Sequence, residues 1–284
     1  MTLPRTVGVV GGGRMGVGIA HAFLLAGAAE VVVVERDDQA AARARAGLER
    51  AVAASVERGS IPRTAPELLG RARVTTSVAD VAAAGLVVEA VPEDLATKVD
   101  VLGRVEAVLP PTAWLATNTS SLSVDALAGH LDHAERFVGL HFFNPVPASA
   151  LVEIVRGART VPVLVEEAAA WVADLGKASI VVSDSPGFAS SRLGVAIGLE
   201  AIRMVEEGVA SPADIDTAMV RGYRFPVGPL RLTDLVGLDV RLGIAEHLER
   251  ELGPRFAVPP LLREMVAAGR LGRKAGEGFF RWDE

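Results

Sequence analysis

Cysteine is absent from the chain, which excludes disulfide bonds and metal sites built from thiolates. Long apolar runs are also missing, since none reaches the roughly 18 residues that a membrane-spanning helix requires. The first residues, MTLPRTVGVVGGG, lack the charged and apolar blocks of a secretory signal peptide. The net charge is −6, which argues against nucleic acid as a partner. We therefore expect a cytoplasmic protein with no membrane partner, no nucleic-acid partner and no metal site.

Lysine and aromatic residues are scarce, whereas hydrophobic residues make up 50% of the chain. The lysines are Lys98, Lys177 and Lys274, and all other basic residues except histidine are arginines. A GC-rich genome accounts for this bias, but the positions that keep a lysine remain of interest. With 284 residues and many hydrophobic side chains, the chain can bury the core of one large domain or two smaller ones.

Short β-branched runs alternate with longer helical patterns over the first part of the chain. Helical spacing covers residues 16–27 and 37–58, and the segment SIPRTAPEL breaks the second pattern. The predicted strands are 6–10, 30–35, 73–76, 85–91, 113–118, 136–142 and 178–184. This alternation is typical of βαβ units and predicts an α/β domain with a mainly parallel sheet.

Helices replace this alternation after Pro186. A long helix is expected over 190–208, and the segment 211–219 begins with a serine N-cap followed by proline. Two or three further helices are expected up to about residue 268, with a possible short strand at FFRW near the C-terminus. We therefore predict an α/β domain over residues 1–184 and an all-α domain over residues 185–284.

A glycine-rich segment, GGGRMG, follows the first predicted strand and opens the first predicted helix. Such segments often form only tight turns, but the next strand ends in an acidic residue, which is typical of a Rossmann-type dinucleotide site. That carboxylate can accept hydrogen bonds from ribose hydroxyls and repels a 2′-phosphate, so NAD is favoured over NADP, although the neighbouring arginine could hold a phosphate. The predicted cofactor-binding residues here are Gly11, Gly13, Arg14, Met15, Gly16, Glu35 and Arg36.

His141 and Glu153 are the candidate catalytic pair. Taken singly, a histidine after an apolar strand is usually a core residue, and a glutamate in a strand-like run usually faces solvent. His141, however, lies near the carboxyl end of a predicted strand, which is the edge where ligands bind in open α/β sheets. A dehydrogenase that oxidises an alcohol needs a base for the hydroxyl proton, and histidine has a suitable pKa. Glu153 could orient that base and stabilise its charged form.

Several further motifs extend along the chain. They are NTSSLS (118–123), GLHFFNPVP (139–147), LVEIV (151–155), DSPGF (184–188), GPLRLTDLVGLD (228–239) and LGRKAGEGFF (271–280). In these motifs the chain resembles the L-3-hydroxyacyl-CoA dehydrogenase family, which includes bacterial 3-hydroxybutyryl-CoA dehydrogenases. The resemblance implies an NAD-dependent dehydrogenase of 3-hydroxyacyl thioesters that forms a homodimer through its helical, substrate-binding domain.

The resemblance also implies roles for particular residues. His141 matches the general acid/base and Glu153 its orienting partner. Ser120 matches a serine that contacts the substrate's reacting oxygen and the cofactor, and Asn144 matches an asparagine beside the histidine near the nicotinamide. The remaining matches to cofactor-binding positions are Glu93, Lys98 and Lys274.

The chain departs from the family pattern at two places that concern the substrate. Ser191 stands where the family has an asparagine that holds substrate oxygens, which suggests tolerated drift, lower activity or an acyl group with its own polar substituent. Ala150 stands where a lysine is usual, and the arm over residues 48–73 offers arginines such as Arg58 for the CoA nucleotide. A thioester on an acyl carrier protein, a free hydroxy acid or sugar acid, and a non-catalytic dinucleotide-binding protein therefore remain alternatives.

Overall fold

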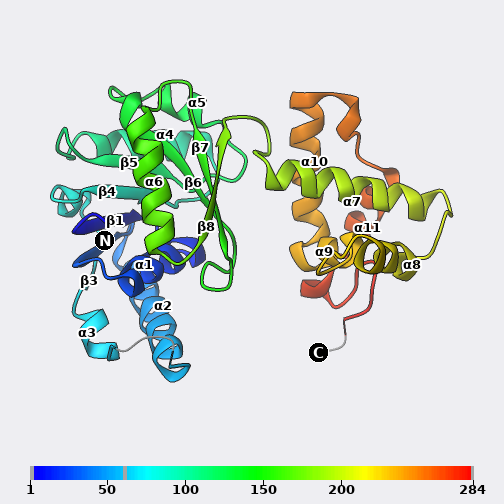
Figure 1. Cartoon of the computed structure of the whole chain (residues 1–284), viewed down its shortest axis with the longest axis horizontal. Helices are drawn as coiled ribbons and strands as arrows, with labels where there is room; N and C mark the ends of the chain where they lie inside the picture. The colour runs from blue at the N-terminus through cyan, green and yellow to red at the C-terminus, as the bar shows by residue number, and fades with distance from the viewer. Residues whose placement is uncertain (1–2, 60–62, 283–284) are drawn as a thin grey trace. The chain divides into compact units, whose positions relative to one another are not determined.

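The computed structural model describes residues 3–59 and 63–282, so the start of the predicted break at SIPRTAPEL lies outside the described residues. The chain divides into two compact units, Met1–Ser185 and Pro186–Glu284. Figure 1 shows a sheet with surrounding helices in the first unit and helices in the second. Within the described ranges, no helix is long and apolar enough to cross a membrane.

The first unit is built on one eight-stranded sheet with the order β3-β2-β1-β4-β5-β6-β7-β8. Its strands are β1 Thr6–Val10, β2 Glu30–Val34, β3 Ala72–Thr75, β4 Leu86–Glu89, β5 Trp114–Thr117, β6 Phe137–Phe142, β7 Leu151–Arg156 and β8 Ala178–Ser183. Neighbouring strands run parallel except β6 and β7, which are antiparallel. The predicted α/β class with a mainly parallel sheet is confirmed, and β7 is a strand that the predicted set omits.

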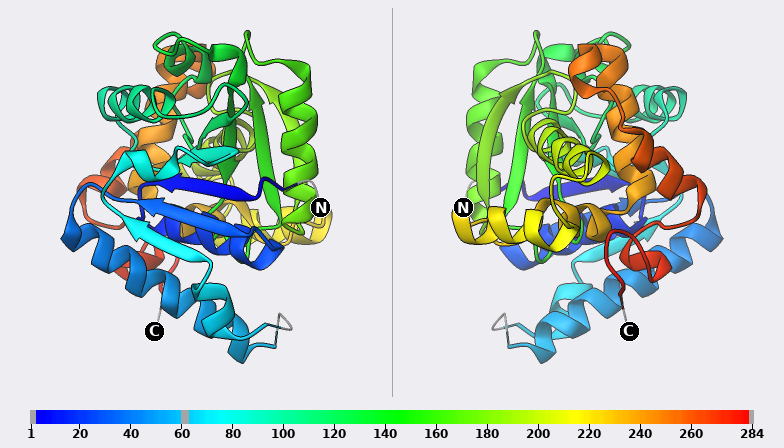
Figure 2. Two further views of the ribbon diagram at one scale, coloured as in Figure 1. Left: turned by 90° about the vertical axis from the view of Figure 1, so that its left-hand side faces the viewer. Right: turned by 90° about the vertical axis from the view of Figure 1, so that its right-hand side faces the viewer.

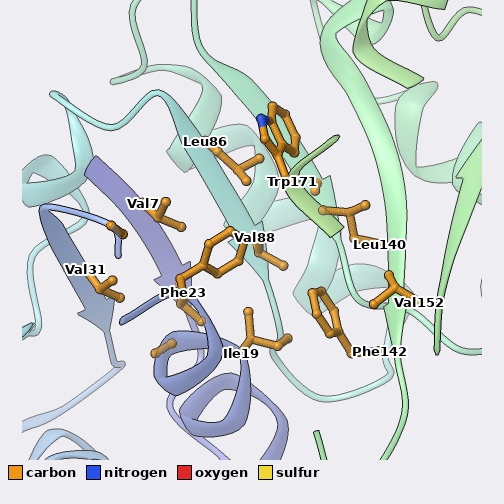
Figure 3. Close-up of a cluster of buried hydrophobic side chains, with 14 of the residues drawn as sticks. Val7, Ile19, Phe23, Val31, Leu86, Val88, Leu140, Phe142, Val152 and Trp171 are labelled. Carbon is orange, nitrogen blue, oxygen red and sulfur yellow. The ribbon is translucent and has the colours of Figure 1, made fainter. Parts of the chain in front are cut away.

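Helices cover the sheet because most of its strands are apolar on both sides. The helices of this unit are α1 Arg14–Ala26, α2 Asp38–Glu57, α3 Ala65–Leu69, α4 Leu95–Glu106, α5 Val124–Ala128 and α6 Pro162–Asp174. Side chains from α1 and α6 share one buried cluster with the strands (Figure 3), including Phe23 and Trp171, which are at most 1% exposed. Burying such large side chains contributes roughly 1.5–3 kcal/mol each.

The strand order reverses between β1 and β4. The chain runs outward from β1 through β2 to β3, which lie side by side in Figure 2, and then crosses to β4 on the other side of β1. In an open α/β sheet, such a reversal leaves a crevice beyond the carboxyl ends of the two strands, where ligands bind. The segment after β1 is the glycine-rich segment, so the topology places it at this switch point.

The second unit is helical, as predicted. Its helices are α7 Ser190–Glu206, α8 Pro212–Thr217, α9 Pro229–Val236, α10 Leu238–Leu252 and α11 Pro260–Ala267, with a π-helical turn at Ala218–Gly222. The Ser211 side chain accepts a hydrogen bond from Asp214 N and Pro212 opens α8, which confirms the predicted helix start. The possible strand at FFRW is wrong: in that segment only Arg281 pairs, in an isolated bridge to Glu277. Instead, buried Asp234 binds the backbone there, by accepting hydrogen bonds from Phe279 N and Phe280 N.

Candidate active site

The glycine-rich segment joins β1 to α1, and its glycines meet different surroundings. Gly11 has a φ of +95°, and a Cβ on it would lie 2.7 Å from the carbonyl oxygen of Ala90. A Cβ on Gly16 would collide with the carbonyl oxygen of Gly11. Around Gly13, in contrast, no described atom lies within 4 Å of the Cβ position. Gly11 and Gly16 are therefore required by the chain's own packing, whereas the space beside Gly13 is open to a ligand.

The start of α1 fits a dinucleotide pyrophosphate. Gly13 is its N-cap, no side chain caps the helix, and its first turn contains no acidic residue. Gly13 and Arg14 are exposed, while Met15 is partly buried. The uncapped backbone N–H groups and the helix dipole favour an anion at this point.

Acidic side chains follow β2, next to the glycine-rich segment. Glu35 accepts hydrogen bonds from Gly12 N at 2.7 Å and from Arg36 N at 3.0 Å. The guanidinium of Arg36 turns to Asp37, with 3.0 Å between Nε and Oδ2. Hydrogen bonds from Ala40 N and from Arg36 lower the pKa of Asp37, so this second carboxylate stays ionised at neutral pH. The Glu35 carboxylate beside the loop favours NAD over the 2′-phosphate of NADP, and Asp37 pairs with the guanidinium of Arg36 that could otherwise hold a phosphate.

His141 and Glu153 face each other across the antiparallel strands β6 and β7. Their Cα atoms are partners in the strand register, which explains how an acid twelve positions downstream reaches the imidazole. His141 Nδ1 lies 2.7 Å from Glu153 Oε2, and the residues are 6% and 0% exposed. The Phe143 ring lies beside the imidazole, with 4.4 Å between the ring centroids. A buried carboxylate at this distance can fix the Nδ1–H tautomer and stabilise an imidazolium.

Glu93 holds the loop after β5, which contains Ser120. Its Oε1 accepts hydrogen bonds from the hydroxyls of Thr119, Ser120 and Ser121 and from the backbone N–H groups of Ser120 and Ser121, at 2.7–3.3 Å. Burial alone raises the pKa of Glu93, but the Lys98 charge and these hydrogen bonds outweigh it and lower the pKa to about 2. Glu93 and Ser120 are both predicted site residues, and the structure connects them through direct hydrogen bonds.

Lys98 is buried in the first turn of α4, where it is only 1% exposed. Its ammonium nitrogen lies 2.7 Å from Glu89 Oε1, 3.2 Å from the Val91 carbonyl oxygen and 3.3 Å from Glu93 Oε2. An ammonium has three N–H donors, so these protein oxygens match its capacity. The predicted contact of Lys98 with the cofactor stays a prediction, and the geometry instead shows Lys98 supporting Glu93.

Three polar residues that shape this region are not among the residues predicted from the sequence. Glu89, fully buried at the end of β4, accepts hydrogen bonds from Lys98 and from the Thr117 hydroxyl at 2.6 Å. Asn118 Oδ1 accepts a hydrogen bond from Phe142 N at 2.9 Å and so connects the loop after β5 to the end of β6. A carboxylate inside an otherwise apolar strand was the one available signal for Glu89.

Lys177, the third missed residue, holds the loop between β6 and β7. Its ammonium donates to the carbonyl oxygens of Val146 at 2.7 Å and Ser149 at 2.5 Å, and burial lowers its pKa. The loop covers residues 143–150. It includes the exposed Asn144 and ends at Ala150, the position at which a lysine is usual in the family. A lysine from the turn before β8 therefore stabilises the loop that follows the strand of His141.

The other predicted residues lie elsewhere. Arg58 is an exposed residue just after α2, and its guanidinium donates a hydrogen bond to the Ser55 hydroxyl at 3.2 Å. Ser191 is partly buried in the first turn of α7. Lys274 binds both carboxylate oxygens of Asp239 at 2.6 Å. Ser191 and Lys274 belong to the second unit, whereas the other predicted site residues belong to the first.

Comparisons with known proteins cover nearly the whole chain. Residues 6–185 match the NAD-binding domain of 3-hydroxyacyl-CoA dehydrogenase, and residues 187–282 match the C-terminal domain of 3-hydroxyacyl-CoA dehydrogenase. The 3-hydroxybutyryl-CoA dehydrogenase of Mycobacterium tuberculosis is 42% identical over 98% of this chain and 98% of its own length. The 3-hydroxyadipyl-CoA dehydrogenase of Escherichia coli is 37% identical over 98% of this chain and 59% of its own length. The solved structure of (S)-3-hydroxybutyryl-CoA dehydrogenase from Ralstonia eutropha is 38% identical, with a TM-score of 0.93 over 99% of this chain and 100% of that chain.

Proposed function

The chain belongs to the 3-hydroxyacyl-CoA dehydrogenase family, and from this we propose that it interconverts a 3-hydroxyacyl-CoA and the corresponding 3-ketoacyl-CoA with NAD as its cofactor. The observation that carries the proposal is the buried contact of 2.7 Å between His141 Nδ1 and Glu153 Oε2. The relatives' names favour 3-hydroxybutyryl-CoA as a test substrate. A carrier-protein thioester or a free hydroxy acid is not needed to explain these similarities.

His141 moves the proton of the substrate's C3 hydroxyl. Because Glu153 accepts the Nδ1–H, the lone pair of the neutral ring is on Nε2, which takes the hydroxyl proton as the C3 carbonyl forms. When bound, NAD⁺ supplies the acceptor for the hydride that leaves C3. Glu153 stabilises the resulting imidazolium, which returns its proton in the reverse direction. General base catalysis of this kind contributes roughly 10²–10⁴ in rate.

Other residues position the substrate and the cofactor in this proposal. Ser120 holds the reacting oxygen, and its backbone and hydroxyl are in turn oriented by Glu93. Asn144 lies near the nicotinamide, and Ser191 and Arg58 contact the acyl-CoA. The residues proposed to hold the cofactor are Gly11, Gly13, Arg14, Met15, Gly16, Glu35, Arg36, Glu93, Ser120, Asn144 and Lys274, and Lys98 acts indirectly by supporting Glu93.

A homodimer through the helical unit is part of the proposal. An apolar groove of about 380 Å³ runs along α7, α8 and the π-helical turn, where its lining includes Ile197, Met204 and Met219. Leu193, on the same helix, is 64% exposed. Exposed apolar surface of this kind is typical of an interface, and the family resemblance favours a second copy of the chain as the partner.

One set of assays tests the proposed function. NADH oxidation would be followed with acetoacetyl-CoA, an acyl-carrier-protein thioester and a free keto acid, for the wild type and for His141→Ala. We expect turnover of the CoA thioester and a loss of about 10²–10⁴ in kcat for the variant. Turnover of free acids alone, or a variant as active as the wild type, would contradict the proposal. Ser191→Asn would show whether the family asparagine raises activity on this short, unsubstituted chain.

A further inference from the structure

Glu89 and Lys98 form an ion pair in the interior of the first unit. Their side chains are 0% and 1% exposed, and Glu89 Oε1 lies 2.7 Å from the Lys98 ammonium. Taking two opposite charges out of water is costly, and their mutual attraction often does no more than offset that cost. Because such a pair adds little net stability, it is better explained by the groups that it holds in place.

The two carboxylate oxygens of Glu89 bind two different segments. Oε1 accepts hydrogen bonds from the Lys98 ammonium at 2.7 Å and from Val91 N at 2.6 Å. Oε2 accepts a hydrogen bond of 2.6 Å from the Thr117 hydroxyl at the end of β5. Glu89 and Thr117 are partners in the register of the parallel strands β4 and β5, so the backbone places them side by side. Glu89 therefore joins the connection between β4 and α4 to the start of the loop after β5.

Both sets of contacts lead to the loop that carries Ser120. On one side, the Lys98 ammonium lies 3.3 Å from Glu93 Oε2, while Glu93 Oε1 accepts a hydrogen bond from Ser120 N at 2.8 Å. On the other side, the Thr117 hydroxyl oxygen accepts a hydrogen bond from Thr119 N at 3.2 Å. The Thr119 hydroxyl in turn donates to Glu93 Oε1 at 2.7 Å. The contacts thus form a closed ring that begins at Glu89 and includes the backbone of the loop.

We propose that Glu89 is a positioning residue of the dehydrogenase reaction, acting through Lys98 and Thr117 to fix the position of Ser120. The inference rests on the proposed function, in which Ser120 holds the reacting oxygen. Glu89 shares the Lys98 ammonium with Glu93 and so holds it at Oε2 of that carboxylate, while Oε1 binds the loop. A misplacement of about 1 Å in a group that orients the substrate can cost about 10² in rate.

Three substitutions interrupt or preserve the ring. In Thr117→Val the side chain keeps its shape but has no hydroxyl, so Glu89 Oε2 loses its donor and Thr119 N loses its acceptor. Thr117→Ser keeps the hydroxyl and removes only a methyl group. Glu89→Gln interrupts the ring at its other partner, because an amide whose oxygen binds Lys98 presents an NH₂ donor, and no acceptor, to the Thr117 hydroxyl.

Amide hydrogen exchange tests the order of the loop without any turnover. The N–H groups of Ser120 and Ser121 both donate to Glu93. We expect these amides to exchange about tenfold or more faster in Thr117→Val and in Glu89→Gln than in the wild type. Thr117→Ser should have a smaller effect than Thr117→Val. Unchanged exchange of both amides in Thr117→Val would overturn the inference, also if Glu89→Gln failed to fold.

A double-mutant cycle distinguishes the positioning of Ser120 from general support of the fold. NADH oxidation with acetoacetyl-CoA would be measured for Thr117→Val alone and in combination with Ser120→Ala. We expect Thr117→Val alone to lower kcat by about tenfold or more, and Thr117→Ser to recover most of this loss. Once Ser120→Ala has removed the hydroxyl, Thr117→Val should lower kcat further by less than about threefold. An equal loss in both backgrounds would mean that the ring only supports the fold, and the inference would be wrong.

Glu167→Gln is the matched control for both measurements. Its carboxylate accepts a hydrogen bond from Trp114 Nε1 at the other end of β5, outside the ring. We expect this variant to behave as the wild type. Failure of the proposed function is a separate result, since it appears as absent NADH oxidation by the wild type with every 3-ketoacyl-CoA tested, whereas amide exchange requires no substrate.

Discussion

At the scale of single residues, the active site depends on how one carboxylate sets the protonation of its neighbour. Glu153 is buried opposite His141 in the strand register, so the backbone of the two strands holds their side chains next to each other. In the proposed mechanism the carboxylate accepts the Nδ1–H and Nε2 accepts the substrate proton. The strand register alone therefore brings the proposed base and its partner together.

Glu153→Gln tests this pairing. The amide keeps the shape of the side chain but cannot stabilise the imidazolium, and its NH₂ group can donate to Nδ1 and so favour the wrong tautomer. We expect kcat to fall by about 10²–10⁴ with little change in KM. Steady-state kinetics with acetoacetyl-CoA and NADH measure this effect. A kcat within about threefold of the wild type, in a variant with unchanged circular dichroism, would contradict the assigned role.

Glu93 makes the folding stability of the protein depend on pH in a predictable way. Its pKa is about 2 in the folded chain, against an ordinary value of 4.5, so its ionised form stabilises the fold. This stabilisation is fully present above the ordinary pKa and is lost as the pH falls towards 2. Glu93→Gln should lower the free energy of unfolding at pH 7 by about 1–3 kcal/mol.

Urea unfolding at pH 7, 4 and 3 measures this difference. The difference in unfolding free energy between Glu93→Gln and the wild type should narrow as the pH falls. Below pH 4.5 the carboxylate of the unfolded wild type takes up a proton, whereas the folded carboxylate, with a pKa of about 2, stays ionised. Glu264→Gln, a change on an exposed glutamate, serves as the control and should show no such trend. A gap that stays constant from pH 7 to pH 3 would show that charge at Glu93 does not matter.

At the scale of elements, the β1–α1 connection contains two kinds of glycine. Gly11 and Gly16 are needed for the packing of the chain itself, whereas Gly13 faces the proposed ligand. Gly16→Ala places a Cβ against the Gly11 carbonyl and should destabilise the protein by about 1–3 kcal/mol. Gly13 has an ordinary backbone conformation, with φ −68° and ψ −171°, and open space beside it. Gly13→Ala should therefore keep the wild-type Tm.

The same pair of variants separates folding from cofactor binding. A methyl group at position 13 would stand where the pyrophosphate approaches the backbone, so Gly13→Ala should weaken NADH binding by about tenfold or more. Fluorescence titration with NADH and a thermal melt measure the two effects side by side. If Gly13→Ala lowered Tm and left NADH affinity unchanged, the ligand-facing role of this glycine would be wrong.

Periodicity predicted most elements but could not predict their pairing. The predicted strands and the two predicted helices of the first unit, 16–27 and 37–58, lie within a few residues of observed elements, whereas α3 to α6 were predicted only as unbounded helical patterns or not at all. The antiparallel strand β7 was missing from the predicted set, because Glu153 interrupts its apolar pattern and no helix separates it from β6. The FFRW segment has strand-like composition, yet hydrogen bonds to Asp234 determine its conformation.

At the scale of the whole molecule, the exposed apolar face of α7 predicts the oligomeric state. We expect light scattering to give twice the chain mass of 29.6 kDa. Ile197→Glu places a charge in the apolar groove and should shift the protein to monomers at micromolar concentration. Leu95→Glu, on an exposed apolar residue of the first unit, should remain dimeric. A wild-type protein that runs as a monomer would exclude the proposed dimer.

The family, the cofactor type and the proposal of His141 and Glu153 as the catalytic pair follow from the sequence, because each depends on residue types at fixed spacing along the chain. The arrangement of the buried polar groups depends on contacts between distant segments. Glu89, Lys98 and Glu93 meet only because β4 and α4 pack together, and Lys98 is thereby enclosed by protein oxygens. Likewise, nothing in the local sequence marks Arg241 of α10, whose burial, with no hydrogen-bond partner for Nε among the described residues, results from the packing of the helices around it. Spacing along a chain specifies chemistry that is local, whereas the pairing of buried charges requires the packed structure.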